Sequence, residues 1–222
     1  FNGEMKADAS APLMFSAWSR QFVRAVFIDE LGGPAVYERV LGARSFRDAL
    51  EGVLERNDAW WCDDKTTADQ AETCEQMSQL ALTRALDELR RRFGADVAVW
   101  RWGDAHVARS EHRPFSRIKA LAPLFELRVP TGGDSYTVNV GRVALQPDGT
   151  TGELYLNEHA ASLRGLYDLN DPRQSRVMHS SGQSGLPWSQ HYASFVKPWA
   201  DVQYLPLWVQ GEKAREGGVL RL

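Results

Sequence analysis

Most of the helical periodicity in this chain lies in its first 94 residues, and this asymmetry limits the fold more than any single motif does. Near the start, large apolar side chains recur every four residues, at Met14, Trp18, Phe22 and Val26. This spacing is typical of an amphipathic helix. We expect the helix to begin after Asp8 or Ser10 and to end at Gly32-Gly33-Pro34.

Three further helices are expected before residue 95. A short one covers about residues 34–41, and Ser45 caps another that runs to about residue 54. The strongest periodic signal predicts a long helix over residues 67–93, with an apolar face formed by Leu82, Leu86, Leu89 and Phe93. We expect Glu88 and the Arg90-Arg91-Arg92 run to be solvated on the opposite side of this helix.

From residues 95–100 onward the pattern changes to short strands separated by turns. This soft boundary divides a mainly helical part, residues 1–94, from a part of strands and loops, residues 95–222. Strands are expected at residues 124–129, 135–143, 162–169, 176–179 and 218–222. Because helices come first and strands later, with no alternating units, the sequence predicts the α+β class.

The charge balance narrows the range of partners. With 26 Lys and Arg against 29 Asp and Glu, the net charge is -3, which gives no basic surface for nucleic acid. No apolar stretch is long enough to cross a bilayer, so neither nucleic acid nor a membrane is an expected partner. The chain opens with Phe1 and carries no signal-peptide pattern, which predicts a processed or excised piece.

Two cysteines, Cys62 and Cys74, flank a polar loop of about a dozen residues. A disulfide between them would stabilise the fold by roughly 3 kcal/mol through loop closure. The alternative is two free thiols. Neither cysteine has the close partner that a zinc site requires, so metal binding is not expected. If the bridge forms, the protein matures outside the cytosol, in the periplasm or as a secreted protein.

Residues 176–199 are the part of the chain least explicable as generic sequence. A short apolar run enters a segment of small and hydroxylated residues, where Gly182 and Gly185 permit positive φ or close backbone approach. Pro187 stiffens the exit from it. Four aromatic residues then follow near helical spacing, namely Trp188, Tyr192, Phe195 and Trp199. The pattern predicts a strand, an ordered turn and a helical segment.

One catalytic hypothesis can be stated from these residues alone. Ser184, His191 and Asp168 supply the residue types of a serine hydrolase. However, Gly182-Gln183-Ser184-Gly185 lacks the Gly-x-Ser-x-Gly elbow, and the order Asp, Ser, His matches no familiar template. An independent hydrolase built on Ser184 is therefore one alternative, and a structural role for Ser184 in the turn is the other. The histidines lack metal-ligand spacing, so no metal site is expected.

The turn also resembles the closing signature of the penicillin amidase family, through Gly182-Gln183-Ser184-Gly185, Pro187, Ser189, His191-Tyr192 and Trp199. Earlier segments match the same family in order: Phe1-Asn2-Gly3 with Asp8, Trp102-Gly103-Asp104-Ala105-His106, Gly132-Gly133-Asp134, and Ser162-Leu163-Arg164 with Asp168. This set spans nearly the whole chain. The chain thus resembles the C-terminal part of the β-subunit of an N-terminal-nucleophile hydrolase.

The resemblance implies a four-layer αββα architecture whose other strands lie upstream of Phe1. It also implies a serine, freed by autoproteolysis upstream, that attacks an amide while its own α-amino group acts as the base. No catalytic residue and no cofactor are then expected in this chain, and calcium ligands of the whole enzyme fall upstream. The expected structural motif residues are Trp102, Gly103, His106, Arg164, Gly182, Gln183, Ser184, Gly185 and His191.

Asp168 is the single residue for which the resemblance implies a place near the reaction. Some cephalosporin-acylase relatives carry an acidic residue there that supports a histidine near the nucleophile. The aspartate is one methylene shorter than a glutamate, and an ion pair with Arg164 is the favoured structural alternative.

The sequence therefore predicts part of an amidohydrolase that cleaves a linear amide, such as a penicillin or cephalosporin side chain or an N-acyl homoserine lactone. Its expected partners are the remaining α- and β-subunit segments of the same precursor and a small-molecule amide. The fragment alone is expected to be inactive. A non-catalytic scaffold or interaction domain derived from the same family is the alternative from another class.

Overall fold

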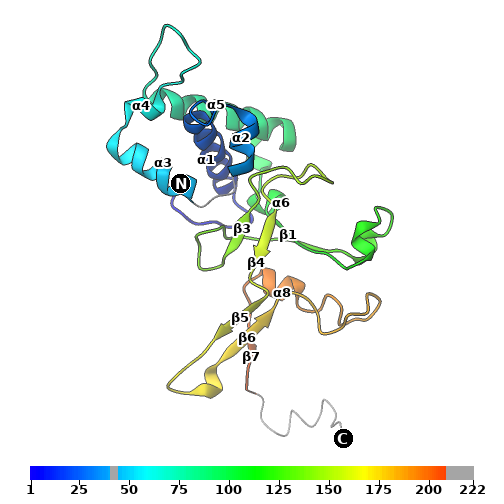
Figure 1. Cartoon of the computed structure of the whole chain (residues 1–222). Helices are drawn as coiled ribbons and strands as arrows, with labels where there is room; N and C mark the ends of the chain where they lie inside the picture. Colours follow the sequence, from blue (N-terminus) through cyan, green and yellow to red (C-terminus); the bar gives the residue numbers. More distant parts are fainter. Residues whose placement is uncertain (41–44, 209–222) are drawn as a thin grey trace, which may run out of the picture.

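A computed structural model describes residues 1–40 and 45–208 of the chain. The helices that precede residue 94 gather at one end, a four-stranded sheet lies in the middle, and a three-stranded sheet lies at the other end (Figure 1). The long helices all precede residue 94 and the strands all follow residue 106. The α+β class, with a helical first half and a β-rich second half, is confirmed.

The helices and short helical turns have the following bounds: α1 Ala11–Phe27, α2 Pro34–Val40, α3 Ser45–Arg56, α4 Ala59–Cys62, α5 Cys74–Phe93, η1 Val97–Val99, α6 Trp102–Ala105, η2 Phe115–Arg117, α7 Ala122–Phe125, η3 Pro172–Gln174 and α8 Val196–Ala200. The first three agree closely with the sequence prediction. Gly32 and Gly33, both at positive φ, follow α1 as expected.

Helix α5 begins later than the sequence predicts. A capping box at Thr73 and Gln76 starts it, because each side chain accepts a hydrogen bond from the backbone N–H of the other residue. Thr67, the expected start, instead donates its hydroxyl to Glu72 and to the Asp64 carbonyl within the preceding loop. The expectation that residues 67–73 are helical is therefore wrong.

The residues that form the buried face of α5 also differ from those predicted. Leu89 is fully buried as expected, but Leu82 is 45% exposed. The face that meets α1 is centred on Met77, Ala81 and Ala85. Small side chains allow the two helix backbones to approach closely, and α1 with α5 makes the most extensive helix contact in the described chain.

A disulfide joins Cys62 at the end of α4 to Cys74 at the start of α5. Of the two alternatives that the sequence leaves open, the structure contains the bridge. Both cysteines are buried in the cluster that includes Phe22, Val26 and Met77. The bridge thus closes the polar loop of residues 63–73 onto the helical core.

Removing this bridge should destabilise the protein measurably. In a Cys62→Ala, Cys74→Ala double variant, we expect the free energy of unfolding to fall by about 3 kcal/mol, because the loop of the unfolded chain is no longer restrained. Thermal unfolding with and without a reductant measures the effect. The reductant should lower the melting temperature of the parent and leave that of the double variant unchanged; equal responses would contradict the prediction.

The larger sheet has the strand order β2-β1-β4-β3. Its strands are β1 Val107–Ser110, β2 Leu127–Pro130, β3 Gly141–Val143 and β4 Asn157–Ala160. Strand β1 pairs antiparallel with β2 and parallel with β4, and β3 pairs antiparallel with β4.

Two of the expected strands differ from the structure in this sheet. Residues 122–125 form α7, with Pro123 in its first turn, so the strand predicted from residue 124 begins only at Leu127. Residues 135–139 are bends and residue 140 belongs to no strand, although the apolar side chains alternate over this segment. The Asp134 carboxylate accepts the backbone N–H groups of Tyr136 and Thr137, which holds a turn there. Val138 is fully exposed.

The smaller sheet has the order β5-β6-β7, with β5 Leu163–Leu166, β6 Arg176–His179 and β7 Leu205–Pro206. Both neighbouring pairs are antiparallel. Strands β5 and β6 lie within the predicted ranges, joined through the expected turn at residues 170–172. The strand predicted at residues 218–222 lies outside the described residues.

The expected helix over the four aromatics is largely wrong. Residues 186–195 are turns and bends, and only α8 at Val196–Ala200 is helical. The aromatic side chains serve different parts of the structure, since Trp199 is buried against Met178 whereas Trp188 is 75% exposed. Among the described residues, no helix is both long and apolar enough to span a membrane.

Candidate functional site

The Trp102-Gly103-x-x-His106 segment forms a buried corner between the helices and the larger sheet. Helix α6 starts there, and its first backbone groups bond to the N-terminal segment: Trp102 N–H donates to the Ala9 carbonyl at 2.8 Å, and Gly103 N–H donates to the Ala7 carbonyl at 2.7 Å. The Trp102 indole N–H donates to the Gly133 carbonyl at 2.9 Å. The corner therefore joins three segments that are distant in sequence.

Gly103 is required at this corner because there is no space for a side chain. A Cβ atom at this position would lie 2.9 Å from Pro130 Cβ and 3.2 Å from the Ala7 carbonyl oxygen. Both neighbours belong to packed segments that cannot move independently. The glycine of the motif thus has a packing role.

His106 is fully buried and stacks on the Trp102 ring with the ring centroids 4.4 Å apart. Its Nδ1 lies 2.9 Å from the Tyr155 carbonyl oxygen, so Nδ1 carries the proton and donates it. Burial lowers the pKa of His106 to about 4, which keeps the ring neutral near pH 7. Its Nε2 is buried and contacts no hydrogen-bond donor among the described residues.

Lowering the pH should destabilise the folded protein because His106 is buried as a neutral imidazole. Between pH 6.5 and 4 the unfolded chain binds a proton at His106 that the folded chain does not, so stability falls as the pH falls. We expect the loss attributable to His106 to reach about 3 kcal/mol at pH 4. Unfolding of the parent and of His106→Asn at pH 7 and pH 4 measures it, with His179→Asn on the exposed end of β6 as control. An unchanged pH dependence in His106→Asn would contradict the assignment.

A buried carboxylate, Glu88, connects this corner to the helices. Its Oε2 accepts Arg20 Nη1 at 2.9 Å and Gln21 Nε2 at 2.7 Å, and its Oε1 accepts the Tyr155 hydroxyl at 2.6 Å. Burial, with the neighbouring Glu88 charge, raises the pKa of Tyr155. Since the Tyr155 carbonyl accepts the His106 proton, one polar chain runs from His106 through Tyr155 and Glu88 to α1.

The expectation that Glu88 is solvated is wrong, because its side chain is only 10% exposed. The sequence did contain a signal for this position. Glu88 follows Ala81 and Ala85 at helical spacing, in the same stripe of α5 that packs on α1. A charged residue in a buried stripe needs partners, and Arg20 on α1 provides the opposite charge.

The closing turn is tightly built around Gly182. A Cβ atom there would overlap the backbone carbonyl oxygens of His191 and Tyr192. The His191 carbonyl also accepts the Ser184 backbone N–H at 3.2 Å. In contrast, Gly185 has open space around it and Gln183 is exposed. This turn therefore depends on Gly182 and on backbone contacts between its two sides.

The structure does not bring Ser184, His191 and Asp168 together as a triad. The Ser184 hydroxyl accepts the Leu186 backbone N–H at 3.1 Å, and the His191 ring lies beside the Gln190 amide at 3.3 Å. The Asp168 carboxylate accepts two backbone N–H groups of its own turn, from Asn170 and Asp171, at 2.9 Å each. Each side chain serves the backbone or a neighbour in sequence.

The expected ion pair between Arg164 and Asp168 is also wrong. Arg164 Nη1 donates to the Trp199 carbonyl oxygen at 2.6 Å, and its guanidinium lies over the Trp199 ring, 4.5 Å from the centroid. Arg164 thus fixes α8 against the smaller sheet through a hydrogen bond and a cation–π contact.

The resemblance implies that the whole enzyme binds calcium through ligands upstream of this chain. Within residues 1–40 and 45–208, no group of three or more His, Cys, Asp or Glu side chains could hold a metal ion.

With this geometry in view, comparison with known proteins identifies the family. The model of the penicillin amidase family matches residues 1–216. The chain belongs to the penicillin amidase family. The segments at residues 102–106 and 182–191, which build a buried corner and a tight turn, lie within the matched range.

Two relatives illustrate the range of the family. The acyl-homoserine lactone acylase QuiP of Pseudomonas syringae pv. syringae (strain B728a) is 27% identical over 222 residues, covering 98% of this chain and 26% of that protein. The penicillin acylase 2 proenzyme of Pseudomonas sp. (strain SE83) is 25% identical over 210 residues, covering 93% of this chain and 25% of that protein. The chain spans about a quarter of the length of these relatives.

Among solved structures, the thermostable penicillin G acylase from Alcaligenes faecalis is similar to this chain with a TM-score of 0.47 and 15% sequence identity. The match covers 96% of this chain and 38% of that chain.

Proposed function

We propose that this chain is a supporting part of an N-terminal-nucleophile hydrolase that cleaves a linear amide. The observation that carries the proposal is the penicillin amidase match over residues 1–216, together with relatives that are named acylases. In the proposed enzyme, the attacking serine and its α-amino base belong to a segment outside residues 1–222. The substrate is an acylated amine such as an N-acyl homoserine lactone or a β-lactam with an amide side chain.

The proposed role of the described residues is to hold the shape of the enzyme. Trp102, Gly103 and His106 join the N-terminal segment to the larger sheet, and Glu88 joins that sheet to the helices. An active site needs its reacting groups held by a rigid surrounding structure, and this network supplies rigidity without needing to touch the substrate.

We also propose that the remaining segments of a common precursor cover the smaller sheet. The end of β5 and the following turn expose large apolar side chains, with Leu166 52%, Tyr167 67% and Leu169 94% exposed. Contiguous exposed apolar side chains mark interaction surfaces. The proenzyme name of one relative supports a precursor that is processed into subunits. The Cys62–Cys74 bridge supports maturation outside the cytosol, in the periplasm or after secretion.

Turnover of a chromogenic acyl anilide tests the proposed function. We expect the complete gene product to release the amine, and the 222-residue chain alone to release none. Parallel assays with an N-acyl homoserine lactone and with a penicillin distinguish the two substrate types. Robust turnover by the isolated chain would contradict a nucleophile outside it, and no turnover by the complete product on any amide would favour the scaffold alternative.

A further inference from the structure

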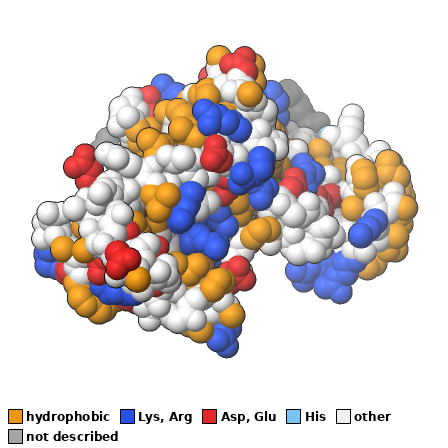
Figure 2. Space-filling model, turned by 90° about the horizontal axis from the view of Figure 1, so that it is seen from above, with side chains coloured by type: hydrophobic (Ala, Val, Ile, Leu, Met, Phe, Trp, Pro, Cys, Tyr) orange, Lys and Arg blue, Asp and Glu red, His pale blue; other side chains and the backbone are white. Residues whose placement is uncertain are grey.

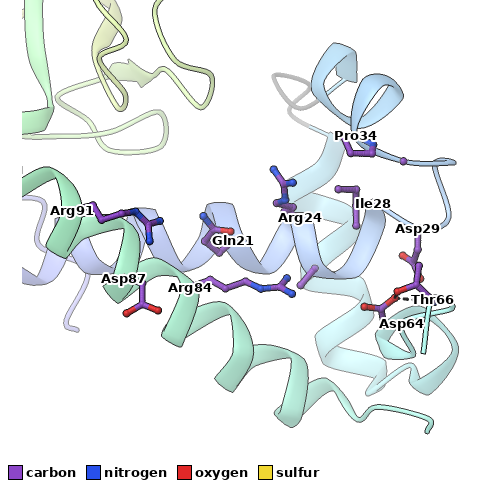
Figure 3. A pocket seen from close by; sticks show the side chains of 12 residues that line it. Gln21, Arg24, Ile28, Asp29, Pro34, Asp64, Thr66, Arg84, Asp87 and Arg91 are labelled. Carbon is purple, nitrogen blue, oxygen red and sulfur yellow. Dashed lines mark hydrogen bonds between the residues drawn. The ribbon is translucent and has the colours of Figure 1, made fainter. Parts of the chain in front are cut away.

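A groove lies beside the contact between α1 and α5, and its lining differs from the rest of the helical surface. The cavity has a volume of about 520 Å³ and is lined by both helices, the start of α2 and the turn at residues 64–66 (Figure 3). Helix α5 contributes Arg84, Asp87 and Arg91, and α1 contributes Gln21, Arg24 and Ile28. Each set has the spacing i, i+3, i+7, so each forms one stripe along its helix.

Three guanidinium groups line this groove without a hydrogen bond or ion pair among the described residues. Arg24, Arg84 and Arg91 make no hydrogen bond or ion pair with any residue in the parts of the chain that the structure describes, 1–40 and 45–208. Neighbouring arginines on the same helices are paired, because Arg20 lies 2.9 Å from Glu88 and Arg90 lies 3.3 Å from Asp87. The lining arginines therefore have unused donors, whereas Arg20 and Arg90 do not face this groove unpaired.

A second cavity of similar size, at the end of the larger sheet, provides the contrast. It is also lined by arginines, but Arg109 contacts Asp148 at 3.1 Å and Arg142 contacts Glu158 at 3.0 Å. Two of the three arginines in that cavity are thus paired with carboxylates of its own walls, and Arg113 is the exception among the described residues. The helical groove also contains three carboxylates, Asp29, Asp64 and Asp87, but none of them pairs with Arg24, Arg84 or Arg91 in the part of the chain that the structure describes.

The carboxylates of the helical groove form their contacts with residues other than its three arginines. Asp87 is paired with Arg90. Asp29 and Asp64 lie at the opposite end from Arg91 (Figure 3) and accept hydrogen bonds from residues of the loop, Lys65 and Thr66. Seen from above the molecule, Lys and Arg side chains lie near the middle of the visible surface, with Asp and Glu side chains among them (Figure 2). The groove thus has an acidic end at Asp29 and Asp64 and, between the two helices, a basic part in which three arginines outnumber Asp87.

We propose that the basic part of this groove binds a small oxyanion that carries two or more negative charges, such as a phosphate group or a polycarboxylate. The planar guanidinium group matches two oxygens of such an anion, and charge-assisted hydrogen bonds are the strongest polar contacts available to it. Because the arginines come from two helices, a bound anion would link α1 to α5. This site is separate from the corner at Trp102 and from the closing turn.

Binding of inorganic phosphate to the complete protein tests the proposal. Calorimetric titration at constant ionic strength should show one saturable site, and phosphate should raise the melting temperature where sodium chloride does not. A parallel titration with citrate distinguishes a phosphate from a polycarboxylate ligand. We expect Arg84→Gln and Arg91→Gln each to weaken the binding of the preferred anion about tenfold.

Arg176→Gln is the matched control, since it removes the same charge from an exposed position on β6. It should change the affinity less than twofold. Because Arg84 and Arg91 are exposed, both variants should fold, which their melting temperatures without anion verify. The proposal is overturned if neither anion saturates, if chloride reproduces the effect, or if the groove variants bind like Arg176→Gln. Amide turnover is not the readout, so failure of the proposed function leaves this test intact.

Discussion

Replacing Glu88 with alanine is expected to lower the free energy of unfolding by about 3–5 kcal/mol. The change removes the acceptor of Arg20, Gln21 and the Tyr155 hydroxyl at once. The guanidinium group of Arg20 then loses its carboxylate partner, although the Arg20 side chain is only 14% exposed. Chemical denaturation of the complete protein, monitored by tryptophan fluorescence, measures the loss.

The neighbouring residue supplies the control for this prediction. Asp87 is 52% exposed in its side chain and, among the described residues, pairs with the exposed Arg90 alone. Asp87→Ala should therefore cost no more than about 1 kcal/mol. Glu88→Gln, which keeps the shape and one acceptor oxygen, should fall between the two variants. Equal losses for Glu88→Ala and Asp87→Ala would show that the polar chain from His106 to α1 does not stabilise the fold.

Replacing Gly182 with alanine is expected to cost about 3 kcal/mol or more, or to prevent folding of the closing turn. The new methyl group would overlap the carbonyl oxygens of His191 and Tyr192, which are backbone atoms and cannot swing aside. Opening the turn would also break the hydrogen bond from Ser184 N–H to the His191 carbonyl. Thermal unfolding and limited proteolysis at residues 180–192 measure the effect.

Gly185→Ala is the matched variant in the same turn. No atom lies within 4 Å of the position that its Cβ would occupy, and its φ is not positive. We expect a change within about 0.5 kcal/mol. If Gly185→Ala proves as damaging as Gly182→Ala, close packing around Gly182 is not the reason for the glycine in this turn.

The sequence predicted the helices well where the apolar period and the end signals agreed. Pro12 in the first turn of α1 and Gly32 after it agree with the observed bounds. The start of α5 was misplaced because Thr73 and Gln76, a local capping box, outweighed the weaker pattern before it. The alternation of apolar residues also predicted a strand at residues 135–140, where the Asp134 carboxylate instead holds a turn.

The motif residues were located from sequence, but their contacts were not. His106 bonds to the Tyr155 carbonyl, 49 residues away, and Trp102 bonds to the Gly133 carbonyl, 31 residues away. Local propensity carries no information about such pairs. For the same reason, the partners of Arg164 were predicted wrongly: a nearby carboxylate was available in the sequence, but α8 brings Trp199 onto the guanidinium group.

The position of the reactive serine tests the central claim most directly. The complete, active protein would be labelled with a sulfonyl fluoride, which reacts with activated serine hydroxyls, and the modified residue would be located by mass spectrometry of its peptides. We predict that the label lies on an N-terminal serine outside residues 1–222, and that turnover is lost in proportion to labelling. A label on Ser184, with turnover lost in proportion, would contradict the claim.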